Sequence, residues 1–284
     1  MPLRIFNNLN SQFAQNRLNN NNENLAKVIS KVSSGERVQK SIDDGASHAI
    51  AESLKSDART IRQGLRNLQN GLSLINVAER GLTDIAGMLN RSIELASLAS
   101  TGTTGSAERR TLQFEYDALK QEINRIANTN EFSGQNLLDG SLAASSPSED
   151  IIIHTGLDSN DENRFNLNEA LNIESITTTG LEIDALDMSN VEGAKAALGK
   201  LQEAIDALIN TRGRIGATHN SLTRATQSLG VNVENITAAE STIRDFDIAQ
   251  EVTDLTKQLL LTQTSAAMVG QSNLIPEGVL LLLQ

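Results

Sequence analysis

Residues 50–96 read IAESLKSDARTIRQGLRNLQNGLSLINVAERGLTDIAGMLNRSIELA, and apolar side chains recur in this stretch at steps of three, four or seven. That spacing is the a/d pattern of a coiled coil, held for more than six heptads. Asp44 is a suitable N-cap before it, and TGTTG at 101–105 is a suitable stop after it. We therefore predict one helix from about residue 45 to 100, about 80 Å long.

Two more helical stretches flank a central region without periodicity. One is expected to start at Ser106 and to end before EFSG at 131–134; the other runs from about Val191 to Ile243, with Arg212, His219 and Thr226 interrupting its apolar seam. The clean seam on 45–100 and the interrupted seam on 191–243 suggest that these two helices pair in antiparallel orientation. The expected fold class is therefore mainly α, a long antiparallel helical bundle with a small β-hairpin region in the middle. The residues expected to form this bundle seam are Ile50, Leu54, Ile61, Leu65, Leu68, Leu72, Leu201, Ile205 and Leu208.

The two ends of the chain carry weaker amphipathic patterns, over 3–32 and from 248 onward. The first contains the run NNNNEN at 19–24, and asparagine is a poor helix former. Short amphipathic helices take most of their stability from packing partners. We therefore expect these end helices to order fully only when a partner buries their apolar stripes.

The chain has three prolines, Pro2, Pro147 and Pro276. Proline ends or kinks a helix because it lacks an N–H donor and its ring clashes with the preceding turn. Their placement predicts two long helical arms with a break near Pro147. Pro2 and Pro276 are expected to mark where the end helices begin and stop.

The break, residues 135–190, loses the helical period and becomes acidic. Segments Ile151–Ile153 and Ile176–Ile183 look β-like, which predicts short strands or a hairpin among loops. Ten acidic residues and one basic residue, Arg164, lie within 141–190, so this segment supplies −9 of the net charge of −11. We expect a solvated acidic surface here.

Composition argues against several functional classes. The chain has no cysteine and 2% aromatic residues, which removes disulfides, thiolate chemistry and a core built on large rings. No basic patch is visible, so nucleic acid is not an expected partner. No cleavable signal peptide and no membrane-spanning run are visible, so membrane insertion is not expected and composition alone favours the cytosol.

No motif in the sequence predicts catalysis or metal binding. His48, His154 and His219 lack metal-ligand spacing. The run Asp158–Glu162 has a faint calcium-loop look, but it lacks the glycine and the distant glutamate of an EF-hand loop, and an acidic turn explains it better. We expect no enzyme activity, no metal and no cofactor.

Ordered blocks at both ends resemble those of a known family. At the N-terminal side they are KVSSGERV at 31–38, DD at 43–44 with AIA at 49–51, NGLSLI at 70–75 and ELA at 94–96. At the C-terminal side they are ENI at 234–236, AAES at 238–241, IRDFDI at 243–248, LTK at 255–257 and the run 267–273. Together these blocks resemble a short bacterial flagellin over roughly 1–140 and 190–284.

The resemblance implies an architecture in two parts. Residues 1–43 plus 244–284 would form an inner coiled-coil domain, and 44–243 would form a helical bundle domain with a β-hairpin or loop segment at about 135–190. The residues expected to pack the inner layer of a filament are Phe6, Leu9, Phe13, Leu255, Leu259 and Leu274.

The resemblance also implies a structural subunit that polymerises with itself into the bacterial flagellar filament for motility. Such a subunit is exported through the flagellar type III channel without a cleaved signal peptide, so its expected location is extracellular. Expected partners are copies of itself, an export chaperone, and the cap and hook-junction proteins. Arg91, Leu95 and Glu115 match positions that an animal Toll-like receptor contacts in flagellins; ordinary subunit packing would explain them equally well.

Two alternatives to a flagellin remain open at this point. A hook–filament junction protein shares similar end regions. A secreted coiled-coil adhesin or receptor ligand would need a binding module in 141–190, where the sequence shows only loops and acidic residues.

Overall fold

The computed structural model describes residues 8–145, 150–158 and 160–282, with side chains up to Leu274. The chain divides into two compact units, one of Met1–Ser56 with Asn235–Gln284 and one of Asp57–Glu234.

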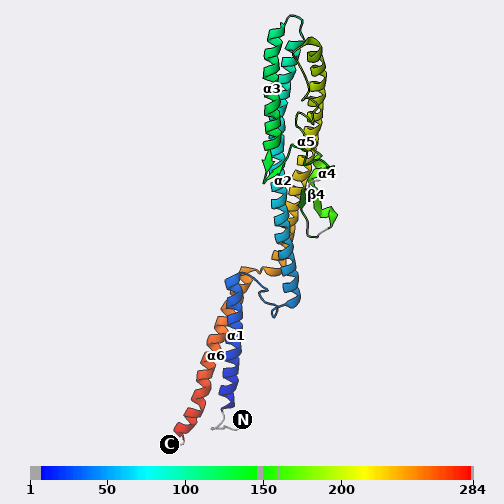
Figure 1. Ribbon diagram of the computed structural model, residues 1–284. Helices are drawn as coiled ribbons and strands as arrows, with labels where there is room; N and C mark the ends of the chain where they lie inside the picture. The colour runs from blue at the N-terminus through cyan, green and yellow to red at the C-terminus, as the bar shows by residue number, and fades with distance from the viewer. Residues whose placement is uncertain (1–7, 146–149, 159, 283–284) are drawn as a thin grey trace. The chain divides into compact units, whose positions relative to one another are not determined.

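The second unit is built on three long helices, α2 (Gly45–Ser100), α3 (Ser106–Thr129) and α5 (Val191–Arg244) (Figure 1). The predicted 45–100 helix is confirmed with the bounds expected. α2 and α5 are antiparallel, since Arg212 of α5 pairs with Glu79 of α2 at 2.6 Å and Leu222, further along α5, lies beside Gly71, earlier on α2. The interrupting Arg212 is thus paired with a carboxylate on the facing helix.

The core of this unit lies along these helices. Leu68, Ile61, Leu201 and Leu208 are buried, as the seam predicts. Leu54, Leu65, Leu72 and Ile205 are partly buried, whereas Ile50 is 52% exposed. Burial raises the pKa of the Tyr116 hydroxyl, which donates to the Ile183 carbonyl at 2.7 Å and so ties the loop after α4 to α3.

Two short hairpins fill the break between the helices. β1 (Glu131–Phe132) pairs with β2 (Gln135–Asn136), and β3 (Ile152–His154) pairs antiparallel with β4 (Arg164–Asn166). The 3₁₀ turn η1 (Asp161–Asn163) precedes β4, and the short helix α4 (Leu167–Leu171) follows it. The predicted β character of Ile151–Ile153 is confirmed within a hairpin.

The predicted strand at Ile176–Ile183 is wrong, because this segment forms turns. Its buried Ile176 and Ile183 pack into the core without a partner strand. Asn124 of α3 accepts from the Thr178 amide at 2.9 Å, and the Ile183 amide bonds the Thr178 carbonyl at 2.9 Å. A side chain and a local turn therefore satisfy backbone groups that a second strand would otherwise bind.

Glycines on α2 let the β3–β4 hairpin approach the helix closely. A Cβ atom at Gly64 would lie 2.6 Å from the Thr155 carbonyl oxygen, and one at Gly71 would lie 2.2 Å from Ile153 Cδ1. Gly64 and Gly71 are seven residues apart and so lie on the same face of α2. A side chain at either position would collide with the hairpin where it now packs.

The first unit is centred on two antiparallel helices, α1 (Leu9–Ser34) and α6 (Ile248–Leu282), which lie side by side (Figure 1). Gly35, with φ of 77°, ends α1 in the left-handed conformation that glycine adopts without strain. The prediction that Pro276 stops the last helix is wrong, because α6 continues to Leu282. Pro276 has no N–H to donate to the backbone carbonyl of Ser272, one turn earlier. That carbonyl accepts a hydrogen bond from the Asn8 side chain instead.

Candidate functional site

The seam between α1 and α6 is unusually polar for a coiled coil. Ser11 Oγ donates to Asn273 Oδ1 at 2.7 Å, and Asn21 Nδ2 donates to Ser265 Oγ at 2.6 Å. The side-chain oxygens of Gln258 and Thr262, also on α6, are buried and have no hydrogen-bond partner in the described part of the chain. A buried polar group without a partner costs stability, so this pair gains little from its own interface.

Many of the large apolar side chains of these helices are exposed to solvent. Of the predicted inner-layer residues, Phe13 is 68% exposed and Leu9, Leu259 and Leu274 are also exposed, while Leu255 is partly buried. Phe6 lies outside the described residues. The exposed set also includes Ile29, Val252, Leu260, Leu261 and Met268. Exposed large apolar side chains are thus spread along both helices.

Arg244 ties the ends of the first unit together. Its guanidinium lies 2.9 Å from Glu36, 3.1 Å from Glu52 and 3.4 Å from Glu240, and its residue surface is 9% exposed. Burial alone would lower the pKa of Arg244, but Glu36 and Glu52 raise it above its ordinary value. One arginine thus joins the loop after α1, the start of α2 and the end of α5.

The three residues predicted for receptor recognition do not share one surface. Arg91 of α2 pairs with Glu115 of α3 at 2.7 Å and with Glu94 at 2.9 Å, and these carboxylates, Glu94 first, raise its pKa. Leu95 is fully buried in the core. Arg91 and Glu115 are therefore surface groups, whereas Leu95 packs in the core.

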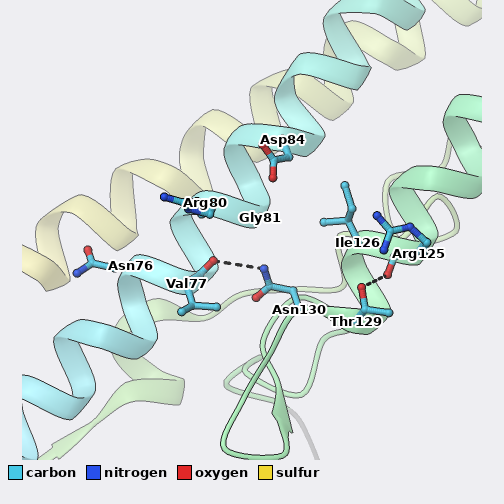
Figure 2. Close-up of a pocket in the computed structure, with 9 residues that line it drawn as sticks. All are labelled: Asn76, Val77, Arg80, Gly81, Asp84, Arg125, Ile126, Thr129 and Asn130. Atoms are coloured by element: carbon cyan, nitrogen blue, oxygen red, sulfur yellow. Dashed lines mark hydrogen bonds between the residues drawn. The ribbon is translucent and has the colours of Figure 1, made fainter.

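A groove of about 360 Å³ lies between α2 and α3, and Figure 2 shows the nine residues that line it. Asn130 Nδ2 donates a hydrogen bond to the Val77 carbonyl at 3.3 Å. Asn130 can come this close to α2 because residue 81 is glycine: a Cβ atom there would lie 2.3 Å from Asn130 Nδ2. The Thr129 hydroxyl donates a hydrogen bond to the Arg125 carbonyl at 2.7 Å. The groove therefore holds no free hydroxyl beside a base, the minimum for nucleophilic catalysis.

Nothing in the described residues gathers into a metal site. Groups of three or more histidine, cysteine or carboxylate residues that could hold an ion are absent there. Over the same residues, no helix has the length and apolarity needed to cross a bilayer.

Comparison with known proteins identifies the family. The model of the bacterial flagellin N-terminal helical region matches residues 5–143, and that of the bacterial flagellin C-terminal helical region matches 198–283. These two matches cover more than half of the chain. The chain belongs to the bacterial flagellin family.

Relatives of this flagellin agree in length as well as in sequence. It is 34% identical to the flagellar filament 30.7 kDa core protein of Treponema maltophilum, covering 98% of this chain and 99% of that protein. It is 33% identical to the flagellin of Bacillus subtilis, covering 99% and 100%. A putative flagellar hook-associated protein from Vibrio parahaemolyticus, 16% identical with a TM-score of 0.59 over 72% of this chain and all of that one, shares the fold.

Family membership settles the broad function. The chain is a structural subunit of the flagellar filament, and neither a junction protein nor an adhesin is favoured. The Arg244 cluster and the glycine contacts at 64 and 71 could not be predicted from the sequence. The sequence contains Arg244 within IRDFDI and the two glycines seven residues apart. Neither pattern shows which carboxylates or which hairpin these residues contact.

Proposed function

We propose that this flagellin polymerises by burying the outward apolar faces of α1 and α6 against neighbouring copies. The exposure of Phe13, Leu259 and Leu274 is the observation that carries this proposal. Association would remove these side chains from water, at about 25 cal/mol per Å² of apolar surface. The inner domain would then be residues 1–43 plus 244–284, and residues 44–243 would form the layer around it.

The polar α1–α6 seam suits a subunit whose ends must be unfolded for transport. Gln258 and Thr262 add little to the stability of the pair in isolation. The subunit would pass through the flagellar type III channel without a cleaved signal and would meet an export chaperone and the hook-junction and cap proteins on its way. Folding of the ends and assembly would be one event, since copies that bind the folded state stabilise it by mass action.

Removal of residues 260–284 tests the assembly proposal. The truncated chain keeps the second unit intact and loses Leu260, Leu261, Met268 and Leu274. It should remain a folded monomer by circular dichroism and should not extend filament seeds. Extension of seeds at the rate of the full chain would overturn the proposal.

Two further proposals follow from family membership. The subunit is expected to have no catalytic activity, as is usual for a structural protein. The Arg91–Glu115 pair would be available to a Toll-like receptor on the monomer. A reporter-cell assay comparing the wild type with Arg91→Ala tests recognition; no response to monomer at saturating dose would refute it.

A further inference from the structure

Phe114 on α3 is the most exposed large apolar side chain among the described residues of the second unit, at 72% exposed. Arg110 and Ala118, one turn away on the same helix face, are exposed as well, so this part of α3 is open to solvent. The chain has only six phenylalanines and one tyrosine. Aromatic side chains are enriched among the residues that anchor protein interfaces.

A pocket of about 360 Å³ lies on the same unit, where the β1–β2 and β3–β4 hairpins meet α2. Its buried lining is apolar and includes Leu74 of α2, Ile153 of β3 and Leu167 of α4. Its exposed lining includes the neutral polar residues Asn70 and Gln135. We call this the hairpin pocket.

The lining of the hairpin pocket suits an aromatic ring. Among the described residues that line it there is no Asp, Glu, Lys or Arg, so a charged ligand would be left unpaired, which is costly. A cavity of about 150 Å³ lined by apolar side chains is large enough to hold benzene. At about 360 Å³, the hairpin pocket has room for a phenyl ring.

Phe114 cannot reach the hairpin pocket of its own chain. Glu115, the next residue, pairs with Arg91 of α2 at 2.7 Å, whereas α2 contributes to the pocket between Asn67 and Leu74. The distance along α2 from Gly71 to Arg91 is about 30 Å. The hairpins lie along α2 well away from the turn that starts α3 (Figure 1). A ring in the pocket must therefore come from another molecule.

The charges beside the two surfaces are complementary. Arg110, one turn before Phe114, forms no ion pair within the described part of the chain. Asp150 directly precedes the pocket residue Ile151 and is exposed, and its carboxylate accepts a hydrogen bond from the neutral Asn166 side chain at 2.9 Å. An arginine beside the ring would thus approach a carboxylate beside the pocket.

We propose that Phe114 of one copy inserts into the hairpin pocket of a neighbouring copy. The inference rests on the proposed self-assembly and names one of its contacts. The chain is a subunit of the flagellar filament, so each copy offers both surfaces to its neighbours. Two different complementary surfaces on one chain form a heterologous contact, which builds an open helical polymer rather than a closed dimer.

Tryptophan fluorescence tests burial of the ring. The chain has no tryptophan, so Phe114→Trp adds a single fluorophore and keeps an aromatic side chain. Its emission should be that of an exposed indole in the monomer. In filaments it should move to shorter wavelength and resist quenching by iodide. Phe114→Ser should leave thermal unfolding of the monomer nearly unchanged and raise the critical concentration for seeded growth about tenfold.

A matched pair of variants tests whether the hairpin pocket receives the ring. Ile152 and Leu157 belong to the same hairpin and are 48% and 47% exposed, and of these two Ile152 lines the pocket. In the Phe114→Trp background, Ile152→Lys should abolish the emission shift or block growth, because it places a charge in the pocket. Leu157→Lys should do neither. Thermal unfolding checks that each monomer is folded.

Cross-linking gives a second measurement that keeps Phe114 and Ile152 in place. The chain has no cysteine, so copies with Ala118→Cys can be mixed with copies with Gln135→Cys and treated with a short bismaleimide. Filaments should yield cross-linked dimers, whereas copies with Thr83→Cys, about 20 Å further along α2 than Asn70, should not replace the Gln135→Cys copies.

The proposal is overturned if the Phe114→Trp emission is the same in monomer and filament. It is also overturned if folded Ile152→Lys and Leu157→Lys variants behave alike, or if filaments give no cross-link between residues 118 and 135. Failure of the wild type to polymerise would instead refute the proposed function.

Discussion

Asn8 donates a hydrogen bond from its side-chain amide to the backbone carbonyl of Ser272, at 2.8 Å. In a regular helix that carbonyl would accept from the amide of residue 276, which is proline and has no N–H. Asn8 Oδ1 also accepts from the Ser11 amide at 3.1 Å, as the N-cap of α1. One side chain thus starts α1 and supplies the donor that Pro276 lacks in α6.

Asn8→Ala should therefore loosen both helices. Loss of the cap and of the bond to Ser272 should cost about 1–3 kcal/mol locally. Hydrogen exchange of assembled filaments should show faster exchange at the start of α1 and after residue 272. In a Pro276→Ala background the residue 276 amide can bond Ser272 itself, so the effect on α6 should shrink. An equal effect on α6 in both backgrounds would contradict the relationship.

Gly64→Ala should destabilise the second unit by about 1–3 kcal/mol. The new methyl group would lie 2.6 Å from the Thr155 backbone oxygen, which cannot move without displacing the hairpin. Gly87→Ala is the matched control, since Gly87 lies on the same helix with nothing within 4 Å of the added atom. It should stabilise the unit by about 0.5–1 kcal/mol. Urea unfolding of the monomers compares the two, and equal effects would refute the close approach.

Acid should loosen the start of α2 through Asp44. The Ser47 hydroxyl and amide bond its carboxylate and lower its pKa from the ordinary value of 3.8. Since the folded pKa lies below the unfolded one, the stabilisation is complete above about pH 4 and is lost as the pH falls through the folded value. Asp44→Asn keeps an acceptor but cannot titrate there. NMR shifts of the Ala46 and Ser47 amides should move between pH 5 and 2 in the wild type and stay nearly constant in the variant.

Substitution of an exposed apolar residue should impair assembly, whereas substitution of a buried one should lower the stability of the monomer. Phe13→Ser removes an exposed ring, so monomer stability should change by less than about 0.5 kcal/mol while filament growth is lost. Leu68→Ala, at a fully buried core position, should cost the monomer about 2–5 kcal/mol. Thermal melts and seeded growth separate the two effects. A large loss of monomer stability in Phe13→Ser would show that the ring packs within the chain.

The helices could be predicted from the sequence because their signals are local. Asp44 and the 101–105 stop bound α2, and its heptads identify the buried face that includes Ile61 and Leu68. Ile176–Ile183 could not be predicted correctly, because its turns depend on Asn124, which is 54 residues from Thr178. In α6, which continues past Pro276, the Ser272 carbonyl accepts its hydrogen bond from Asn8 near the other end of the chain. In each case the deciding hydrogen bond comes from a distant part of the chain.

Electron microscopy of the purified protein, concentrated and seeded with short filament fragments, shows whether this chain polymerises with itself. We expect long helical filaments from the full chain and none from the chain that lacks residues 260–284. Full-length protein that stays monomeric in the presence of seeds, with its helices intact by circular dichroism, would contradict it.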